Sequence, residues 1–305
     1  MKSQRKVEPG CRRQFLASGT VIAAGALLET LGLTACSPLP TQKPVIGLVL
    51  GAGAARGFAH IGVIKSLEAQ GIRPDLVIGS SAGSVVAALL ASGLTGNEMN
   101  RLAMNLDEAT IADWGLPFMG RFGGLIKGDA LQTMVNREVQ NKTIEQMQIP
   151  LGIVATELQS GKGVLFRTGN TGLAVRASCS VPGVFQPAVI SGHEYVDGGL
   201  VAPVPVSYAR QMGATIVIAV NISSEPIHQD ASGTFGILQQ TISIMQQSIN
   251  QYELKSADIV IQPQLLKMSS GDFKARNAAI LSGELATQQK LGQIKELLKL
   301  NAQVR

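Results

Sequence analysis

Short apolar runs alternate with stretches that have helical spacing along most of the chain after residue 44. Several of these runs are β-branched and end at glycines or polar residues, which predicts buried strands. The predicted strands are 45–50, a run ending at 78, 149–157, 215–221 and 259–262, and 162–168 is a hairpin partner for 149–157. Strands that alternate with helices in this way favour a parallel sheet.

The segments between the strands predict helices of different character. The first predicted helix begins at the glycine-rich turn 51–57 and runs through Leu67 to a stop at Gly71. The others are 82–90 ending at Ser92-Gly93, 97–106, a small-residue helix in 174–187 halted by Pro182 and Pro187, and an amphipathic 284–300. Residues 111–128 are apolar but rich in glycine and proline. They are interpreted either as ordinary loop packing or as a lid or acyl-chain contact surface.

Composition supports a folded α/β protein. The 305 residues are 45% hydrophobic and only 15% charged, and few are aromatic. Abundant Gly, Ala, Val, Ile and Leu suit buried parallel strands and closely packed helices. One domain of about 260 residues fits this length, and two are possible.

The net charge of +5 resides mainly at the N-terminus. The first 36 residues contain five basic and two acidic side chains, so the remainder carries only about +2. No basic run remains there that would indicate a nucleic-acid partner.

Residues 1–36 are predicted to be a targeting segment. A basic start precedes an apolar stretch from Phe15 to Leu33, and Leu33-Thr34-Ala35-Cys36 resembles a bacterial lipobox in which Cys36 is acylated. Arg12-Arg13 resembles a twin-arginine export signal, and Sec export is the alternative. An uncleaved membrane anchor is disfavoured by Glu29.

The segment 37–44 is then a Pro-rich tether, and 45–305 is the folded domain. Cys11 would leave with the leader and Cys36 would carry lipid, so Cys179 alone remains and no disulfide is expected within the domain. Ser37 after the lipidated cysteine favours the outer membrane. We therefore expect a lipid-anchored, periplasm-facing envelope protein.

A nucleophile elbow is predicted where the second apolar run ends. The motif Gly79-Ser80-Ser81-Ala82-Gly83 matches G-x-S-x-G, in which serine occupies a sharp strand-to-helix turn. Gly79 and Gly83 keep side chains away from this turn. Alone the motif is a weak signal in a chain with 34 glycines.

The turn after the first strand is a candidate anion site, because backbone N–H groups and a helix N-terminus point the same way. Dinucleotide binding is disfavoured, since Arg56 replaces the third glycine of G-x-G-x-x-G and Ser81 stands where an acidic residue belongs. A P-loop is excluded because no G-K-[ST] follows. The preferred interpretation is an oxyanion hole, whose donors are each worth roughly 3 kcal/mol of barrier. Its candidate residues are Gly51, Ala52, Gly53, Ala54, Ala55 and Arg56.

Two candidates for the base that activates Ser81 follow from the sequence. Asp197 lies after a β-type run and before Gly198 and Gly199, and a carboxylate shielded from water is basic enough to take the serine proton. Alternatively, His228 completes a triad with Ser81 and Asp197. His60 is expected to be structural, and His193 to lie in a turn.

Four sequence blocks together resemble the bacterial branch of the patatin-like phospholipases. They are Gly47–Val63 (GLVLGAGAARGFAHIGV), Gly79–Gly83 (GSSAG), Ala177–Pro187 (ASCSVPGVFQP) and Asp197–Gly199 (DGG). The resemblance spans about residues 45–221 and includes Ala155–Leu158. Ala52, Ala54 and Glu157 depart from the residues frequent in the family.

The resemblance implies a three-layer α/β/α domain with a mostly parallel sheet. It also implies a Ser81/Asp197 dyad with the 51–56 loop as oxyanion hole, and no metal, cofactor or catalytic histidine. The expected activity is hydrolysis of phospholipid or lysophospholipid esters. Two alternatives stay open: a lipid-binding or envelope-scaffold protein without turnover, and acyl transfer to an acceptor other than water.

Overall fold

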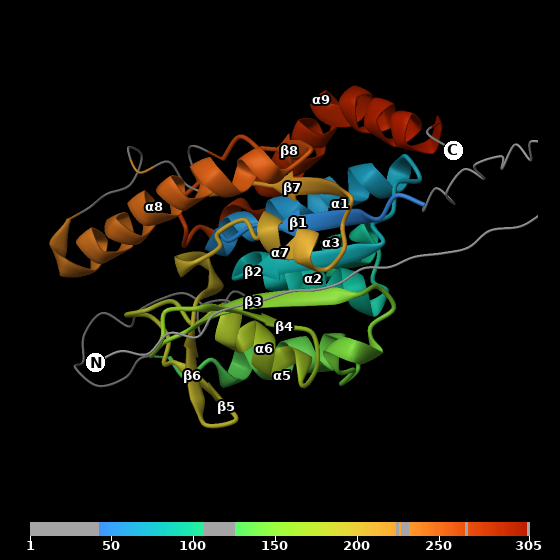
Figure 1. The fold of residues 1–305 in the computed structure, drawn as a ribbon. Helices are drawn as coiled ribbons and strands as arrows, with labels where there is room; N and C mark the ends of the chain where they lie inside the picture. The colour runs from blue at the N-terminus through green and yellow to red at the C-terminus, as the bar shows by residue number, and fades with distance from the viewer. Residues whose placement is uncertain (1–42, 107–125, 224–225, 227–231, 266–267, 304–305) are drawn as a thin grey trace, which may run out of the picture. The chain divides into compact units, whose positions relative to one another are not determined.

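The protein is built on a mixed β-sheet with a parallel centre. The computed structural model describes residues 43–106, 126–223, 226, 232–265 and 268–303. The strands there are β1 (Ile46–Leu50), β2 (Leu76–Ser80), β3 (Leu151–Glu157), β4 (Gly163–Phe166), β5 (Ala188–Ile190), β6 (His193–Val196), β7 (Ile216–Val220) and β8 (Ile259–Ile261). Their order is β5-β6-β3-β2-β1-β7-β8, with β4 also paired to β3 (Figure 1).

Strands β3, β2, β1, β7 and β8 are parallel to one another, whereas β4 and β6 are antiparallel to β3. Strand β5 pairs antiparallel with β6 at the edge. The predicted α/β fold with a mostly parallel sheet is confirmed, as is the hairpin between β3 and β4.

Helices cover both faces of this sheet. They are α1 (Phe58–Ala69), α2 (Ala82–Ser92), α3 (Gly96–Asn105), α5 (Asp129–Glu138), α6 (Thr171–Ser178), α7 (Val206–Gln211), α8 (Gly233–Glu253) and α9 (Arg276–Gln303). Because side chains alternate along a strand, Leu48 and Leu50 pack into the large core under α1, α2, α3 and α9, while Val49 packs into the smaller core under α7. The described residues therefore form three unequal layers.

The strand register brings two sharp turns together at one edge of the sheet. Leu50 of β1 pairs with Gly79 of β2 and with Val220 of β7. The chain therefore leaves β1 and β2 at neighbouring positions, and the loop after Leu50 lies beside Ser81. Open α/β sheets place their sites at this carboxyl edge.

Most predicted helices agree with the structure, and α6 and α9 differ from it at one end. Helix α6 ends at Ser178, well before Pro182, where the Ser180 hydroxyl donates to the Arg176 carbonyl at 2.8 Å. Helix α9 begins at Arg276, ahead of the predicted 284. Helices α5, α7 and α8 were not predicted.

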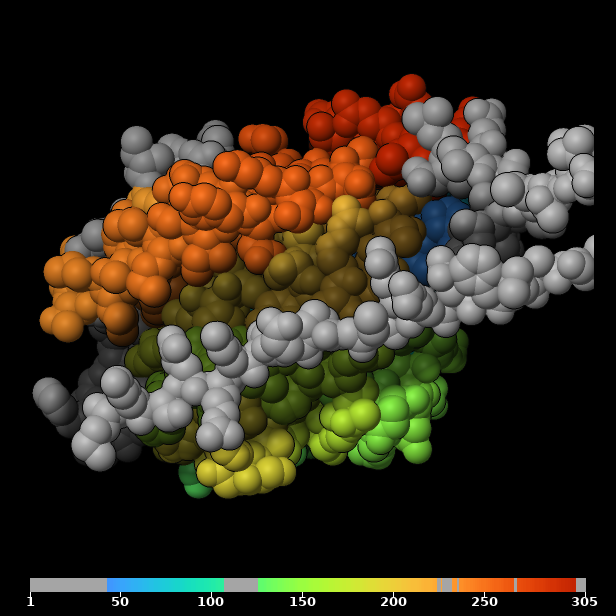
Figure 2. Space-filling model, in the orientation of Figure 1, coloured from blue at the N-terminus to red at the C-terminus, as the bar shows by residue number. Residues whose placement is uncertain are grey.

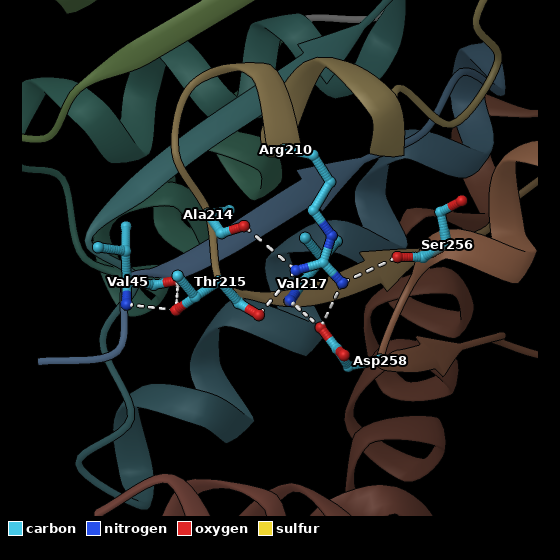
Figure 3. A network of polar contacts seen from close by, with 7 residues as sticks. All are labelled: Val45, Arg210, Ala214, Thr215, Val217, Ser256 and Asp258. Atoms are coloured by element: carbon cyan, nitrogen blue, oxygen red, sulfur yellow. Dashed lines mark hydrogen bonds and ion pairs between the residues drawn. The ribbon is translucent and has the colours of Figure 1, made fainter. Parts of the chain in front are cut away.

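The opposite edge of the sheet is held by an arginine. Arg210, near the end of α7, donates to the carbonyls of Ala214 at 3.1 Å and Thr215 at 2.7 Å, and to Asp258 Oδ2 at 2.7 Å (Figure 3). Asp258 Oδ2 also accepts the N–H of Val217 at 2.6 Å. This network joins the starts of β7 and β8, at the opposite ends of these strands from the carboxyl edge.

Helix α8 lies on the surface, where it is the orange ridge in Figure 2. It contains no charged residue before Glu253. Its exposed apolar side chains are Ile237, Leu238, Ile244, Met245 and Tyr252. Among the described helices, none has the length and apolarity needed to span a membrane.

Candidate active site

Ser81 occupies a strained turn between β2 and α2. Its φ of +52° and ψ of −126° lie in a region that disfavours L-residues and costs about 1–3 kcal/mol. A Cβ at Gly79 would lie 2.3 Å from the Gly83 carbonyl oxygen, and a Cβ at Gly83 would lie 2.0 Å from that of Leu50. Both flanking positions thus require glycine, and the serine is held at the tip of the turn.

The hydroxyl of Ser81 donates to Asp197. Ser81 Oγ lies 2.7 Å from Asp197 Oδ2, and the N–H of Gly199 donates to Oδ1 at 2.7 Å. Asp197 directly follows β6, whose last residue pairs with Thr156 of β3. The Thr156 hydroxyl donates to the Asp197 carbonyl at 2.8 Å. The carboxylate is therefore fixed from both its backbone and its side chain.

Asp197 is buried and has no ion-pair partner among the described residues. Only 4% of the residue is exposed, and no described Lys, Arg or His forms an ion pair with it. Burial raises the pKa of Asp197 from 3.8 to about 6, although the hydrogen bonds from Ser81 and Gly199 oppose that shift. The carboxylate is therefore a stronger base than an exposed aspartate, yet remains ionised at neutral pH.

Ser178, at the end of α6, supports the elbow. Its Oγ accepts the N–H of Ser81 at 2.8 Å and donates to the Val154 carbonyl at 2.6 Å. The backbone of Ser81 is thereby tied to β3. The neighbouring Cys179 is buried, and both burial and the charge of Asp197 raise the pKa of its thiol, so it stays protonated.

The loop 51–56, called the glycine loop below, has fewer free backbone N–H donors than the sequence indicated. Four of its six N–H groups donate to carbonyl oxygens: Gly51 to Val220 at 3.1 Å, Ala52 to Pro203 at 2.8 Å, Ala55 to Ser270 at 3.0 Å and Arg56 to Gly53 at 3.1 Å. Within the described part of the chain, the N–H groups of Gly53 and Ala54 have no acceptor. Both residues border the cavity that contains Ser81. The candidate oxyanion hole therefore narrows to these two.

Two buried side chains hold the loop in place. Arg56 Nε donates to the Gly53 carbonyl and Nη2 to Ser270 Oγ, each at 3.3 Å, and burial lowers the pKa of Arg56 to about 10. His60 Nε2 lies 2.8 Å from the Gly51 carbonyl oxygen, and burial lowers the pKa of His60 to about 4. His60 is therefore neutral near pH 7 and donates this hydrogen bond, which agrees with its expected structural role.

The other histidines give no second base among the described residues. His193 begins β6 rather than lying in a turn, and its Nδ1 lies 2.8 Å from Glu157 Oε1. His228, the alternative triad member, is outside the described residues, as are Cys36, residues 37–42 and most of 111–128.

Two cavities border the glycine loop. One, of about 520 Å³ including its open mouth, is lined by Ser81 and Asp197 together with Arg56 and the α8 residues Gln239, Ser243 and Gln246. The other, of about 720 Å³ measured in the same way, lies along α2 and has only apolar lining residues. Ala54 borders both cavities.

Comparison with known proteins assigns the class. The family model described as patatin-like phospholipase matches residues 48–210, and the chain belongs to this family. An uncharacterized NTE family protein of Mycobacterium tuberculosis is 36% identical over 183 residues, covering 60% of this chain and 50% of that protein. Lysophospholipase NTE1 of Kluyveromyces lactis is 32% identical over 193 residues, covering 59% and 13%. The matched stretch thus spans half or less of these relatives.

The fold has a counterpart among solved structures. VipD from Legionella pneumophila shares 14% sequence identity at a TM-score of 0.52, covering 82% of this chain and 67% of that one. At this identity the likeness concerns the fold alone.

Proposed function

We propose that the protein is a serine acyl-ester hydrolase of the phospholipase A or lysophospholipase type, acting through an acyl-Ser81 intermediate. The observation that carries this proposal is the 2.7 Å hydrogen bond from Ser81 Oγ to the buried carboxylate of Asp197, made at a strained strand-to-helix turn. A hydroxyl needs a base within this reach to become a nucleophile.

In the first half of the reaction, Ser81 Oγ attacks the ester carbonyl carbon while Asp197 Oδ2 takes the hydroxyl proton. The carbonyl oxygen gains the negative charge and accepts hydrogen bonds from the N–H groups of Gly53 and Ala54. The intermediate then collapses, the bond to the alcohol oxygen breaks, and Asp197 returns its proton to that oxygen. The products of this half are the free alcohol and acyl-Ser81.

The second half repeats these steps with water. Asp197 removes a proton from water as its oxygen attacks the acyl carbon, and the proton then returns to Ser81 Oγ. A free fatty acid leaves. Because Asp197 has a raised pKa, it can accept and return the proton in each half without a histidine.

The family and the N-terminal motif support a lipid substrate in a membrane. The family model is described as phospholipase, and the Kluyveromyces lactis relative is named a lysophospholipase. A lipid on Cys36 would hold the domain beside such substrates through the 37–44 tether. We therefore include anchoring at the cell envelope, facing the periplasm, in the proposal.

Active-site labelling tests the nucleophile. A fluorophosphonate should modify Ser81 in the folded protein, and p-nitrophenyl butyrate should be hydrolysed. Ser81→Ala should lose both the adduct and turnover. Asp197→Asn should lower kcat/KM by about 10²- to 10⁴-fold, the usual range for loss of a general base. Asp129→Asn, at an exposed carboxylate of α5, is the matched control and should retain activity.

Other outcomes favour the alternatives. A folded protein without an adduct on Ser81 would support a lipid-binding or scaffold role. If His228→Ala lowers kcat/KM by several orders of magnitude, a triad of Ser81, Asp197 and His228 is favoured over the dyad. Mass spectrometry of products from an envelope lipid extract separates hydrolysis from acyl transfer, because only transfer yields a new ester.

A further inference from the structure

Helix α8 turns polar side chains toward the protein and apolar side chains toward solvent. Its side chains that face inward include Gln239, Ser243 and Gln246, which border the cavity that contains Ser81. These three recur at the spacing of one helix face. A surface helix ordinarily has the reverse arrangement, with its apolar stripe packed on the core. The apolar side chains of α8 thus lack the cover that such a stripe ordinarily has.

The exposed apolar side chains of α8 recur in steps of seven residues, which is close to two helical turns, so they lie on one face. This face, called the α8 stripe below, consists of Ile237, Leu238, Ile244, Met245 and Tyr252. Its two isoleucines are 58% and 49% exposed. The helix that bears the stripe forms the ridge at the surface in Figure 2. A row of large apolar groups of this kind indicates an interaction site.

The α8 stripe lies on a helix without charge along almost its whole length. The first charged residue of α8 is Glu253, and its carboxylate turns to α7, where it accepts the N–H and the hydroxyl of Ser207, each at 2.9 Å. The next charge along the chain is Lys255, whose Nζ lies 5.2 Å from the centroid of the Tyr252 ring. An uncharged apolar stripe that ends in a tyrosine and a lysine suits the boundary between lipid tails and head groups.

The chain enters the folded domain beside the end of α8. Val45, which follows the 37–44 tether, donates its N–H to Thr215 Oγ1 at 2.8 Å (Figure 3). Arg210 links Thr215 to the segment after α8, because it donates to the Thr215 carbonyl at 2.7 Å and to the Ser256 carbonyl at 2.9 Å. The start of the domain and the segment that follows α8 therefore belong to one hydrogen-bond network.

The length of the tether keeps this end of α8 close to the proposed lipid anchor. Val45 follows Cys36 by nine positions, and a chain of this length spans at most about 30 Å. Helix α8 has 21 residues and is therefore roughly 31 Å long. A lipid on Cys36 would hold Val45, and with it the end of α8, no farther from the bilayer surface than about the length of this helix.

We propose that the α8 stripe docks on a lipid bilayer, with α8 parallel to the membrane surface. The proposal rests on the proposed function, which assumes a membrane substrate and an anchor at Cys36. Docking removes apolar side chains from water without burying a charge. It also brings the cavity that α8 borders, with Ser81 in it, to the surface where lipid esters are.

A second copy of the chain is a less suitable occupant of the α8 stripe. When helices pair in water through an apolar seam, charged residues that flank the seam set the partner and the orientation. Helix α8 has no such residue before Glu253. The bilayer requires no such pairing, and an uncharged helix meets it without loss.

A fluorescent label on α8 tests the docking. The position is Thr241, which is exposed between Ile237 and Ile244 and is changed by Thr241→Cys to carry a nitrobenzoxadiazole group. The protein is the full chain with Cys11→Ser and Cys36→Ser. Vesicles of phosphatidylcholine and phosphatidylglycerol in equal parts should raise the emission several-fold, because this group brightens when it leaves water. Nitroxide-bearing lipids should then quench it.

The label should react at this position alone, since the remaining Cys179 is buried and burial raises the pKa of its thiol. The control is the same label on Ala278→Cys, at an exposed position of α9. It should respond to neither the vesicles nor the nitroxide lipids, even where another part of the chain binds the vesicle. No change at position 241, or an equal change at position 278, would overturn the proposal.

Substitutions in the α8 stripe test which side chains dock. Ile237→Gln with Ile244→Gln should raise the vesicle concentration for half-maximal emission at least about tenfold, because two apolar side chains lose their lipid contact. Leu281→Gln with Leu285→Gln is the matched control, since these leucines of α9 are 54% and 50% exposed. It should leave that concentration unchanged. Glutamine is a good helix former, and circular dichroism checks that each variant is folded.

Two further measurements separate the possible outcomes. Sedimentation equilibrium without lipid should show no dimer that depends on the stripe. A dimer that Ile237→Gln with Ile244→Gln dissociates would assign the stripe to a second copy and overturn the docking. Docking needs no turnover, so the label at position 241 should respond equally in Ser81→Ala.

The docking and the hydrolase proposal can therefore fail separately. If Ser81 reacts with fluorophosphonate but the label on α8 stays in water, the docking fails and the hydrolase proposal stands. If the label enters the bilayer but Ser81 never reacts, the hydrolase proposal fails alone.

Discussion

Burial gives Asp197 a pKa that meets two requirements of a base: it must accept a proton from serine and must be ionised at neutral pH. A carboxylate with an ordinary pKa would hold a proton too weakly to take it from a serine, while a much higher pKa would keep it protonated at neutral pH. The raised pKa of about 6 lies between these limits. The two hydrogen bonds to Oδ1 and Oδ2 also keep the carboxylate from rotating away.

The proposed role of Asp197 predicts a single ionisation in the pH profile. Because the pKa of this acid is raised, the active carboxylate form is lost as the pH falls through about 6. At pH 5 kcat/KM should be about one tenth of its plateau, and above pH 7 it should be constant. Hydrolysis of p-nitrophenyl butyrate between pH 4.5 and 8 measures this. A profile with no break there, or a break that disappears in His228→Ala, would contradict Asp197 as the base.

The residues of the site differed in how far the sequence could predict them. Ser81 was predictable from the local G-x-S-x-G pattern, a weak signal that gained weight from the other sequence blocks typical of the family. Thr156 and Ser178 support the site through hydrogen bonds across the sheet, and no local pattern signals such contacts. The free donors of Gly53 and Ala54 emerged only once the carbonyl partners of the other loop residues were known.

At the scale of elements, α1 and α9 pack with their backbones almost in contact. A Cβ at Gly62 of α1 would lie 1.9 Å from the Ile280 carbonyl oxygen, and a Cβ at Gly283 of α9 would lie 2.0 Å from that of Ala59. The two glycines therefore let each helix approach the other. Because α1 begins just after the glycine loop, this contact also fixes the loop's position.

Replacing one of these glycines should separate the helices. Gly283→Ala should destabilise the protein by about 1–3 kcal/mol, since backbone rather than a flexible side chain must move. Gly292→Ala is the control on the same helix, where nothing lies within 4 Å of the added Cβ, and it should stabilise by about 0.5–1 kcal/mol. Urea denaturation measures both. Equal stability of the two variants would show that the close packing is not required.

Among the helices that the sequence did not predict, α8 has a weak apolar pattern. Helix α8 is rich in glutamine, serine and threonine, and its apolar residues are not confined to one buried stripe. One side of α8 faces the candidate site, where Gln239, Ser243 and Gln246 border the cavity that contains Ser81. The parallel strands were predictable for the opposite reason, since they are buried on both faces and form continuous apolar runs.

At the scale of the whole molecule, the carboxyl edge of the sheet and the edge held by Arg210 are built differently. The latter joins the starts of the strands through main-chain contacts and one half-buried ion pair (Figure 3). The carboxyl edge has the two cavities and the strained turn at Ser81. The alternation of strands and helices predicted this edge as the site, but the unequal layers depend on long-range packing.

The proposed anchor at Cys36 gives a prediction for the full-length protein in cells. Labelling with an alkyne analogue of palmitate should mark the wild-type protein, which should sediment with membranes. Cys36→Ser should lose the label and shift to the soluble fraction, because each buried methylene of the lipid contributes about 0.8 kcal/mol. Cys11→Ser is the control and should keep both properties. Labelled, membrane-bound Cys36→Ser would contradict the anchor.

The strained conformation of Ser81 also bears on how such a site evolves. Glycine adopts a φ of +52° without the penalty that serine has there. A lineage that no longer needed the serine would therefore gain stability by exchanging Ser81 for glycine, and selection for stability would favour that exchange. Persistence of serine at this position among descendants is then a sign of selection for chemistry, whereas glycine would mark a copy that keeps the fold for another purpose.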